Sequence, residues 1–244
     1  MMKVTLITIS YNASQTIKNT LMSVKSQTHT DIEHLIIDGN STDDTLLICK
    51  EFPHISKIIS EPDKGVYDAF NKGLKLATGQ IVGFLNSDDV FYDKNTLQII
   101  VEGFDEQTHC VFGNLDYTNA NGKVIRKWRS NPYQKGAFTK GWMPAHPPFY
   151  CRKEIYDRLG GYDESFQIAG DFELALRFLE KNGITAGFIN KTLVKMRAGG
   201  ISNSGIKSKI KILLEEFRAF EINRIKINKL KYIAHKALKI KEFF

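Results

Sequence analysis

The sequence lacks any long apolar run. No stretch of about 18 consecutive apolar residues occurs in its 244 residues, so no transmembrane helix is predicted. The N-terminal segment MMKVTLITIS contains one lysine and a short β-like run. It has neither the longer apolar core nor the cleavage site of a secretory signal. These absences predict a cytoplasmic protein.

Cysteine is also scarce. Cys49, Cys110 and Cys151 are the only three in the chain, and they lie far apart. An odd number at this spacing fits neither a disulfide framework nor a metal-binding motif. We therefore expect three reduced thiols that act as small buried hydrophobic groups, in a reducing cytosolic compartment.

Two nucleotide-binding fingerprints are missing. The chain contains no Gly-x-Gly-x-x-Gly motif, which argues against a dinucleotide enzyme. The stretch 200–208 faintly resembles a phosphate-binding P-loop, but Ile206 separates Gly205 from Lys207. Because that loop needs adjacent Gly and Lys, an ATPase is excluded.

The first hundred residues instead alternate between strand and helix signals. Each apolar, strand-like run is followed by residues at helical spacing, such as Ile17, Leu21 and Val24. Repeated βα units predict an α/β fold with a mostly parallel sheet flanked by helices. The four predicted strands are residues 4–9, 32–38, 56–60 and 81–85.

The second hundred residues are less regular. Asn121-Gly122, between LDY and VIRKW, predicts a β-hairpin. A helix is expected from Asp171, and two short strands near 185–189 and 192–197 are expected to close the domain. Residues 1–200 then form one domain, followed by a tail over 201–244.

The tail carries the net charge. Residues 201–244 contain eleven Lys or Arg and four Glu, which equals the +7 of the whole chain. Apolar residues recur at roughly helical spacing between the basic ones, which predicts one long basic amphipathic helix or two shorter ones.

Polar and acidic segments follow all four predicted strands. They are TISYN (8–12), DGNSTD (38–43), EPDKG (61–65) and NSDD (86–89). Ligands bind at the carboxyl ends of strands in an open parallel sheet, so these segments predict a shared ligand site. Asp88 and Asp89 suit Mg²⁺ or Mn²⁺. An Asp-rich turn that caps a helix is the alternative for this pair.

The chain resembles the family 2 glycosyltransferases, which have the GT-A fold, and in particular the bacterial enzymes of O-antigen and colanic-acid-type exopolysaccharide synthesis. The resemblance spans about 170 residues in the family's order. It divides 1–200 into a nucleotide-sugar-binding half (1–100) and an acceptor-binding half (101–200). The matching segments are 5–12, 36–45, 60–89, 146–165 and 169–177.

The resemblance implies a role for individual residues. Asp171 matches the catalytic base, although helix capping is the alternative from its position alone. Asp88 and Asp89 match the metal-binding region, with Mn²⁺ or Mg²⁺ as cofactor. The residues expected to bind the donor are Thr8, Ser10, Tyr11, Asp38, Lys64, Asn86, Asp88 and Arg197.

The implied reaction is transfer of a single sugar, with inversion, from a nucleoside-diphosphate sugar to an acceptor hydroxyl. The Gln-x-x-Arg-Trp motif of processive synthases is absent, and Asn86 replaces the first Asp of the usual metal motif. Two alternatives are open, a non-catalytic nucleotide-sugar-binding protein and a sugar-nucleotide nucleotidyltransferase. The latter usually needs a Gly-rich basic loop, which SYNASQT (10–16) does not supply.

The tail leaves its partner open. Residues 207–244 suit the anionic inner face of the cell membrane, which would bring the enzyme to a lipid-linked saccharide acceptor. Their apolar face suits packing on the body or on a second subunit, as in a homodimer, equally well. Nucleic acid is not an expected partner, because no aromatic and basic platform accompanies the charge.

Overall fold

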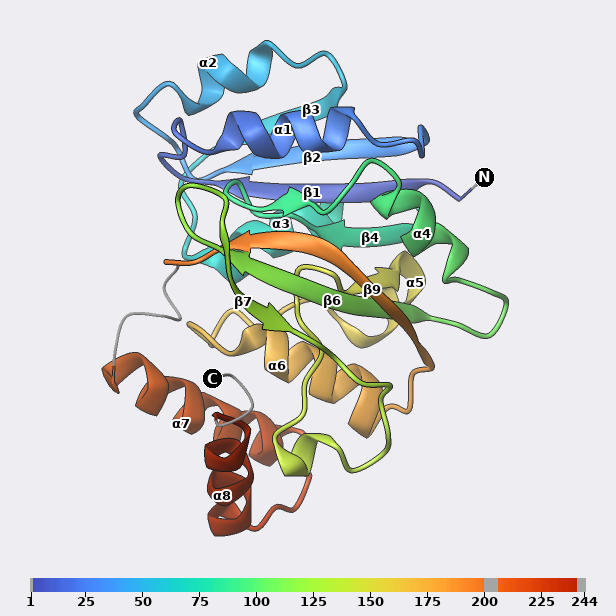
Figure 1. Ribbon diagram of the computed structural model, residues 1–244, viewed down its shortest axis with the longest axis vertical. Coiled ribbons are helices and arrows are strands. Elements are labelled where there is room, and N and C mark those ends of the chain that lie inside the picture. The colour runs from blue at the N-terminus through green and yellow to red at the C-terminus, as the bar shows by residue number, and fades with distance from the viewer. Residues whose placement is uncertain (1, 200–205, 241–244) are drawn as a thin grey trace.

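The computed structural model describes residues 2–199 and 206–240. It is an α/β structure built on one mixed sheet in the order β3-β2-β1-β4-β8-β6-β9-β5, with β7 paired to β6 (Figure 1). The strands are β1 Val4–Ser10, β2 Ile32–Asp38, β3 Ile55–Ser60, β4 Ile81–Phe84, β5 Val90–Phe91, β6 Cys110–Thr118, β7 Val124–Trp128, β8 Tyr150–Arg152 and β9 Ala186–Arg197.

The four strands predicted in the first hundred residues form and lie parallel to one another, as β1 to β4. The apolar runs of β1, β2 and β4 are largely buried, which is typical of a parallel sheet covered by helices, whereas the edge strand β3 is only partly buried. Beyond β4 the sheet is mixed, because β8 runs antiparallel to both β4 and β6.

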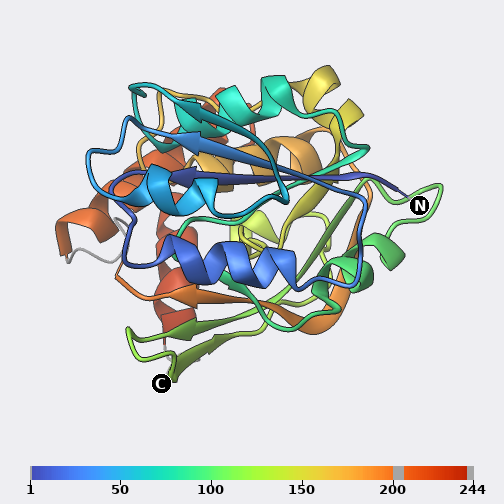
Figure 2. The same cartoon turned by 90° about the horizontal axis from the view of Figure 1, so that it is seen from above.

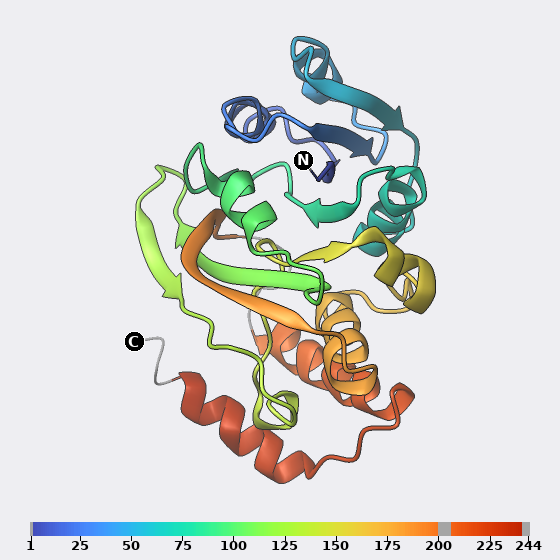
Figure 3. The ribbon, with the colours of Figure 1, turned by 90° about the vertical axis from the view of Figure 1, so that its right-hand side faces the viewer.

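Helices cover both faces of the sheet (Figures 2 and 3). The first and second helices share one small core with β2, made by Ile17, Leu21, Ile36 and Cys49. The third, fifth and sixth helices pack into the largest core, on the opposite face. These helices are α1 Ile17–Lys25, α2 Thr45–Lys50, α3 Val66–Leu76, α4 Thr96–Glu102, α5 Lys153–Leu159 and α6 Gly170–Ala175, which continues into a π-helical segment, Leu176–Lys181.

Two expectations for the second half need correction. The predicted strands near 185–189 and 192–197 form one strand, β9. Its pairing with β6 shifts register at Gly113–Leu115, which accommodates residues 190–191 between the two predicted strands. Cys110 and Cys151 are not free thiols. They face each other on β6 and β8, with Cα atoms 4.1 Å apart, and form a disulfide. Cysteine usage therefore gives no support to a reducing compartment, and only Cys49 is a buried free thiol.

The tail forms two helices, α7 Ile206–Ile222 and α8 Lys229–Ile240. Ala219, Phe220 and Tyr232 are fully or almost fully buried and belong to the main core with α6. One face of the tail thus packs on the body, although the domain boundary at residue 200 stays a prediction. Within the described residues, no helix combines the length and apolarity needed to cross a membrane.

Candidate functional site

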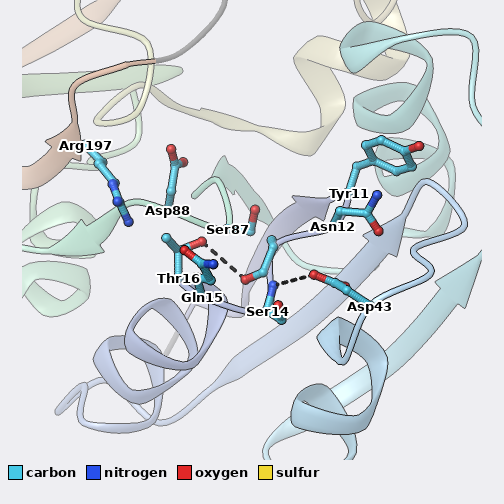
Figure 4. Close-up of a pocket in the computed structure, with 10 residues that line it drawn as sticks. Tyr11, Asn12, Ser14, Gln15, Thr16, Asp43, Ser87, Asp88 and Arg197 are labelled. Atoms are coloured by element: carbon cyan, nitrogen blue, oxygen red, sulfur yellow. Dashed lines mark hydrogen bonds between the residues drawn. The ribbon is translucent and has the colours of Figure 1, made fainter. Parts of the chain in front are cut away.

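The strand order of the sheet reverses at β1. β2 and β3 extend the sheet on one side of β1, whereas β4 lies on its other side. Ligands of open α/β sheets bind outside the strand ends at such a reversal. A cavity of about 410 Å³ opens there, and we call it the β1–β4 cavity (Figure 4). It is lined by Tyr11, Asn12, Ala13, Ser14, Gln15, Thr16, Asp43, Ser87, Asp88 and Arg197.

Hydrogen bonds join the loops after β1 and β2 into one wall of this cavity. The Asn12 amide donates to Ser41 Oγ at 2.9 Å, and Asn12 Oδ1 accepts from the Thr42 amide at 2.9 Å. Asn12 adopts a left-handed conformation (φ 48°) that is uncommon outside glycine. Backbone strain of this kind concentrates at functional sites, where surrounding contacts hold it in place.

Asp43 belongs to the same wall and is a site residue that the sequence interpretation missed. Its carboxylate accepts from the Ser14 amide at 3.0 Å and from the Thr45 hydroxyl. The Thr45 hydrogen bond is the main reason that the pKa of Asp43 is lowered. Its place in the polar segment after β2 was the available signal.

The three residues predicted on the first strand have different environments. The Tyr11 side chain is 66% exposed and lies at the edge of the cavity. Thr8 and Ser10 are buried. Thr8 Oγ1 lies 3.0 Å from His34 Nε2, and Ser10 donates to Asp38. Of the three, only Tyr11 lines the cavity.

Asp38 is fully buried and holds the strand ends together. Its carboxylate accepts from the Ser10 and Ser60 hydroxyls, each at 2.8 Å, and from both the amide and the hydroxyl of Ser41. Both oxygens are therefore engaged. A contact between Asp38 and a nucleotide base, as the resemblance implies, stays a prediction.

The two adjacent carboxylates after β4 also differ. Asp88 lines the cavity beside Arg197 (Figure 4). Burial raises the pKa of Asp88, while the positive charges of Arg197 and His146 act in the opposite direction. Asp89 is almost fully buried, and its Oδ1 accepts from the Arg197 amide at 3.1 Å. Burial, followed by the charge of Asp88, raises the pKa of Asp89 well above its usual value.

Asp88 offers the β1–β4 cavity one carboxylate, the kind of oxygen ligand that Mg²⁺ prefers. Among residues 2–199 and 206–240, no three His, Cys, Asp or Glu side chains converge as a complete metal site. Mg²⁺ usually takes one or two protein carboxylates and completes its shell with water and substrate phosphates. Asp88 supplies such a carboxylate, and the buried Asn86 Oδ1 has no hydrogen-bond partner within the described chain. Asp89 as a second ligand stays a prediction.

The two predicted basic residues lie in different places. Arg197, at the end of β9, lines the cavity and is held there by Asp89. Lys64 is exposed just before α3, is not among the cavity residues, and its amide donates to Asp68 at 2.9 Å. The sequence also predicts that the Gly-rich segment 199–202 covers the diphosphate. Gly199 has φ 127°, and 200–202 lie outside the described residues.

Asp171 lies in the first turn of α6, within reach of His146. Its Oδ2 is 3.2 Å from His146 Nδ1, and its side chain is 20% exposed. The N-cap of α6 is Ala169, so Asp171 is not the capping residue. Burial lowers the pKa of His146, whereas the charges of Asp171 and then Asp88 raise it. His146 therefore lies within the electrostatic influence of both carboxylates.

Glu173, two residues further on, is unsuited to proton transfer at the cavity. It is 2% exposed and pairs with Arg177 at 2.9 Å. Asn223 Nδ2 donates to the same carboxylate at 3.1 Å. Of the two carboxylates on α6, Asp171 is thus the more exposed, at 20% against 2% for Glu173.

Solved structures of glycosyltransferases share this fold. TarS residues 1–349 of S. aureus, in complex with UDP-GlcNAc, superposes with a TM-score of 0.73 at 19% identity, covering 95% of this chain and 69% of that one. The mannosyltransferase PcManGT of Pyrobaculum calidifontis, in complex with GDP-Man and Mn²⁺, gives a TM-score of 0.70 at 20% identity, covering 97% and 69%. At these identities the likeness shows the fold, and it confirms the predicted GT-A architecture.

Sequence relatives carry the identification further. A PGL/p-HBAD biosynthesis glycosyltransferase of Mycobacterium tuberculosis is 27% identical over 200 residues, which is 79% of this chain and 76% of the relative. Another glycosyltransferase of that species is 30% identical, covering 71% and 68%. The family described as "Glycosyl transferase family 2" matches residues 5–164. The resemblance is thereby confirmed, and the chain belongs to glycosyl transferase family 2.

Proposed function

We propose that this glycosyltransferase moves one sugar from a nucleoside-diphosphate sugar to an acceptor hydroxyl, with inversion at the anomeric carbon. The observation that carries the proposal is the β1–β4 cavity, whose wall combines an exposed aromatic ring, a carboxylate and a guanidinium. TarS and PcManGT, which share the fold, were solved with UDP-GlcNAc and with GDP-Man and Mn²⁺.

The cavity residues divide according to the parts of such a donor. Tyr11 offers a π-face for the base, and Arg197 offers a charged donor to the diphosphate. Asp88 would hold Mn²⁺ or Mg²⁺ against the same phosphates, where the cation neutralises the charge of the leaving group. Thr8, Ser10 and Asp38 shape the strand ends behind the cavity, and Lys64 and Asn86 stay predicted donor-binding residues.

Asp171 is the proposed general base. The acceptor oxygen bonds to the anomeric carbon as the bond from that carbon to the diphosphate oxygen breaks. The diphosphate leaves with the bonding electron pair, and the hydroxyl proton passes to the Asp171 carboxylate. The His146 ring, 3.2 Å from Asp171 Oδ2, restrains the carboxylate during this transfer.

The proposed process is bacterial surface polysaccharide synthesis, in which the acceptor is a saccharide that a lipid can carry. The missing Gln-x-x-Arg-Trp motif supports single additions. A thermal-shift screen of UDP-, GDP- and dTDP-sugars with Mn²⁺ tests the donor class, because a bound ligand raises the melting temperature. Stabilisation with transfer supports the enzyme. Stabilisation without any transfer would favour a binding protein, and no stabilisation would contradict the proposal.

Arg197→Ala is expected to raise the donor KM about tenfold, because a charged hydrogen bond contributes about 1.5–3 kcal/mol to binding. Steady-state kinetics in donor concentration measure this effect. Lys195→Ala is a control on the same strand, since its ammonium group lies 4.9 Å from the centroid of the Tyr92 ring and does not line the cavity. An unchanged KM for Arg197→Ala would remove this residue from the donor site.

The outer face of α8 supports peripheral membrane binding. Leu230, Ile233 and Leu238 are 80%, 41% and 60% exposed, and lysines 229 and 231 beside them are exposed too. Each such lysine contributes on the order of 1 kcal/mol near an anionic bilayer. We propose that this face lies on the cytoplasmic leaflet.

Leu230→Glu combined with Ile233→Glu is expected to abolish sedimentation with phosphatidylserine-containing vesicles. Leu47→Glu, a change at a 62% exposed leucine on α2, is the control and should sediment normally. Normal sedimentation of the double variant would contradict the membrane proposal. A wild type that stays in the supernatant and elutes as a dimer would assign this face to a second subunit.

A further inference from the structure

One carboxylate of the tail binds the chain immediately before α6. Glu215 on α7 accepts from three consecutive backbone amides, those of Gln167 (3.1 Å), Ile168 (2.9 Å) and Ala169 (2.8 Å). The next amide, of Gly170, donates to the Tyr67 hydroxyl at 2.7 Å. The four residues that precede Asp171 are thus fixed by side chains of two other helices.

Glu215 belongs to a face of α7 that contacts this segment along its length. Lys211, Glu215 and Arg218 are spaced by four and three residues, which places them on one side of a helix. Lys211 Nζ bonds to the Gln167 side chain, and Arg218 donates to the Ser165 carbonyl at 3.1 Å and to its hydroxyl at 2.6 Å. We call residues 165–170 the base-approach segment.

Helix α7 lies next to α6 (Figures 1 and 3), and residues of both helices belong to the main core. Phe220 packs edge-on against Phe172, the residue after Asp171, with ring centroids 5.5 Å apart. Asn223, buried at the end of α7, donates to Glu173. The tail therefore contacts the chain on both sides of Asp171, through backbone groups before it and through side chains after it.

We infer that Glu215 is a positioning residue for the catalytic base, and that α7 thereby helps to hold the base in place. Glu215 is not among the residues that line the β1–β4 cavity, so it acts through the placement of Asp171. Hydrogen bonds from backbone amides to a carboxylate are among the strong hydrogen bonds of proteins. A displacement of a catalytic group by about 1 Å lowers the reaction rate roughly 100-fold. The inference rests on the proposed role of Asp171.

A double-mutant cycle tests the inference with UDP-GlcNAc and GDP-mannose as donors. Glu215→Ala is expected to lower kcat about 100-fold, and Glu215→Gln, which keeps one acceptor oxygen, about tenfold. The donor KM should stay within about twofold. In the Asp171→Asn background, either Glu215 change should cost no further activity. Glu221→Gln, an exposed position on the same helix, is the matched control and should match wild type.

Amide hydrogen exchange over 165–172 provides a second measurement that needs no substrate. Glu215→Gln should accelerate exchange in the base-approach segment about tenfold, whereas Glu221→Gln should not. Unchanged exchange, or an equal loss of kcat in the Asp171→Asn background, would overturn the inference. Normal turnover of Asp171→Asn alone would instead overturn the proposed base, so the two failures are distinguishable.

Discussion

Asp171→Asn is expected to lower turnover by about 10²- to 10⁴-fold, the range that a general base contributes. The amide has the shape of the carboxylate but cannot accept the acceptor proton at neutral pH. Donor binding should be unchanged, because Asp171 does not line the β1–β4 cavity. Single-turnover transfer and donor titration measure the two effects separately.

The matched control for this change is Asp157→Asn. Asp157 is 61% exposed and pairs with Lys153 on the surface of α5, so its loss should leave turnover unchanged. Near-normal turnover of Asp171→Asn would remove Asp171 from the mechanism. Since Glu173 is buried and paired with Arg177, α6 offers no second carboxylate for the same role.

Asp88→Asn is expected to abolish the stabilisation that Mn²⁺ gives in the presence of a nucleoside-diphosphate sugar, and to lower turnover more than 100-fold. A divalent cation contributes several kcal/mol of charge stabilisation to a leaving diphosphate, and Asp88 is the carboxylate at the cavity wall beside Arg197. Thermal shift with and without Mn²⁺, together with transfer assays after EDTA treatment, measures both effects.

Asp31→Asn is the control for the Asp88 change, since Asp31 is exposed in the turn before β2. It should keep both the Mn²⁺ response and the activity. If wild type retained full activity in EDTA and Asp88→Asn behaved like wild type, the metal assignment would be wrong while the glycosyltransferase assignment would stand.

The first half of the fold was predictable because each buried parallel strand has a continuous apolar run. β5 and β8 were not, since they have two and three residues and are defined by their partners in space. The continuity of β9 was not predictable for the same reason, because it depends on the pairing of β9 with β6. Residues 185–189 and 192–197 look like two strands, but a register shift against β6 keeps them in one.

The candidate site was predictable in position and less so in detail. Strand ends located Tyr11, Asp88 and Arg197, which the structure brings to one cavity. The sequence does not show which way a side chain points at a strand end, since successive residues face opposite sides. In the structure Asp38 and Asp89 face inward, where their carboxylates accept hydrogen bonds from hydroxyls and amides of neighbouring segments.

For the tail, too, the sequence predicted the helices but not their contacts. An amphipathic pattern has an apolar face, but its sequence does not show what that face contacts. Glu215 and Glu216 were the available signal, because two adjacent acidic residues in a tail of net charge +7 suggest specific partners. Glu215 binds the base-approach segment, and Glu216, 2% exposed, accepts from the Tyr232 hydroxyl at 3.0 Å and pairs with Lys236 of α8.

A crystal structure with an intact donor and Mn²⁺ most directly tests the central claim that the β1–β4 cavity binds the diphosphate for attack from the Asp171 side. We predict the diphosphate beside Asp88 and Arg197, the base against Tyr11, and Asp171 on the face of the sugar opposite the leaving oxygen. A donor bound outside this cavity, or a sugar turned away from Asp171, would contradict the proposed mechanism.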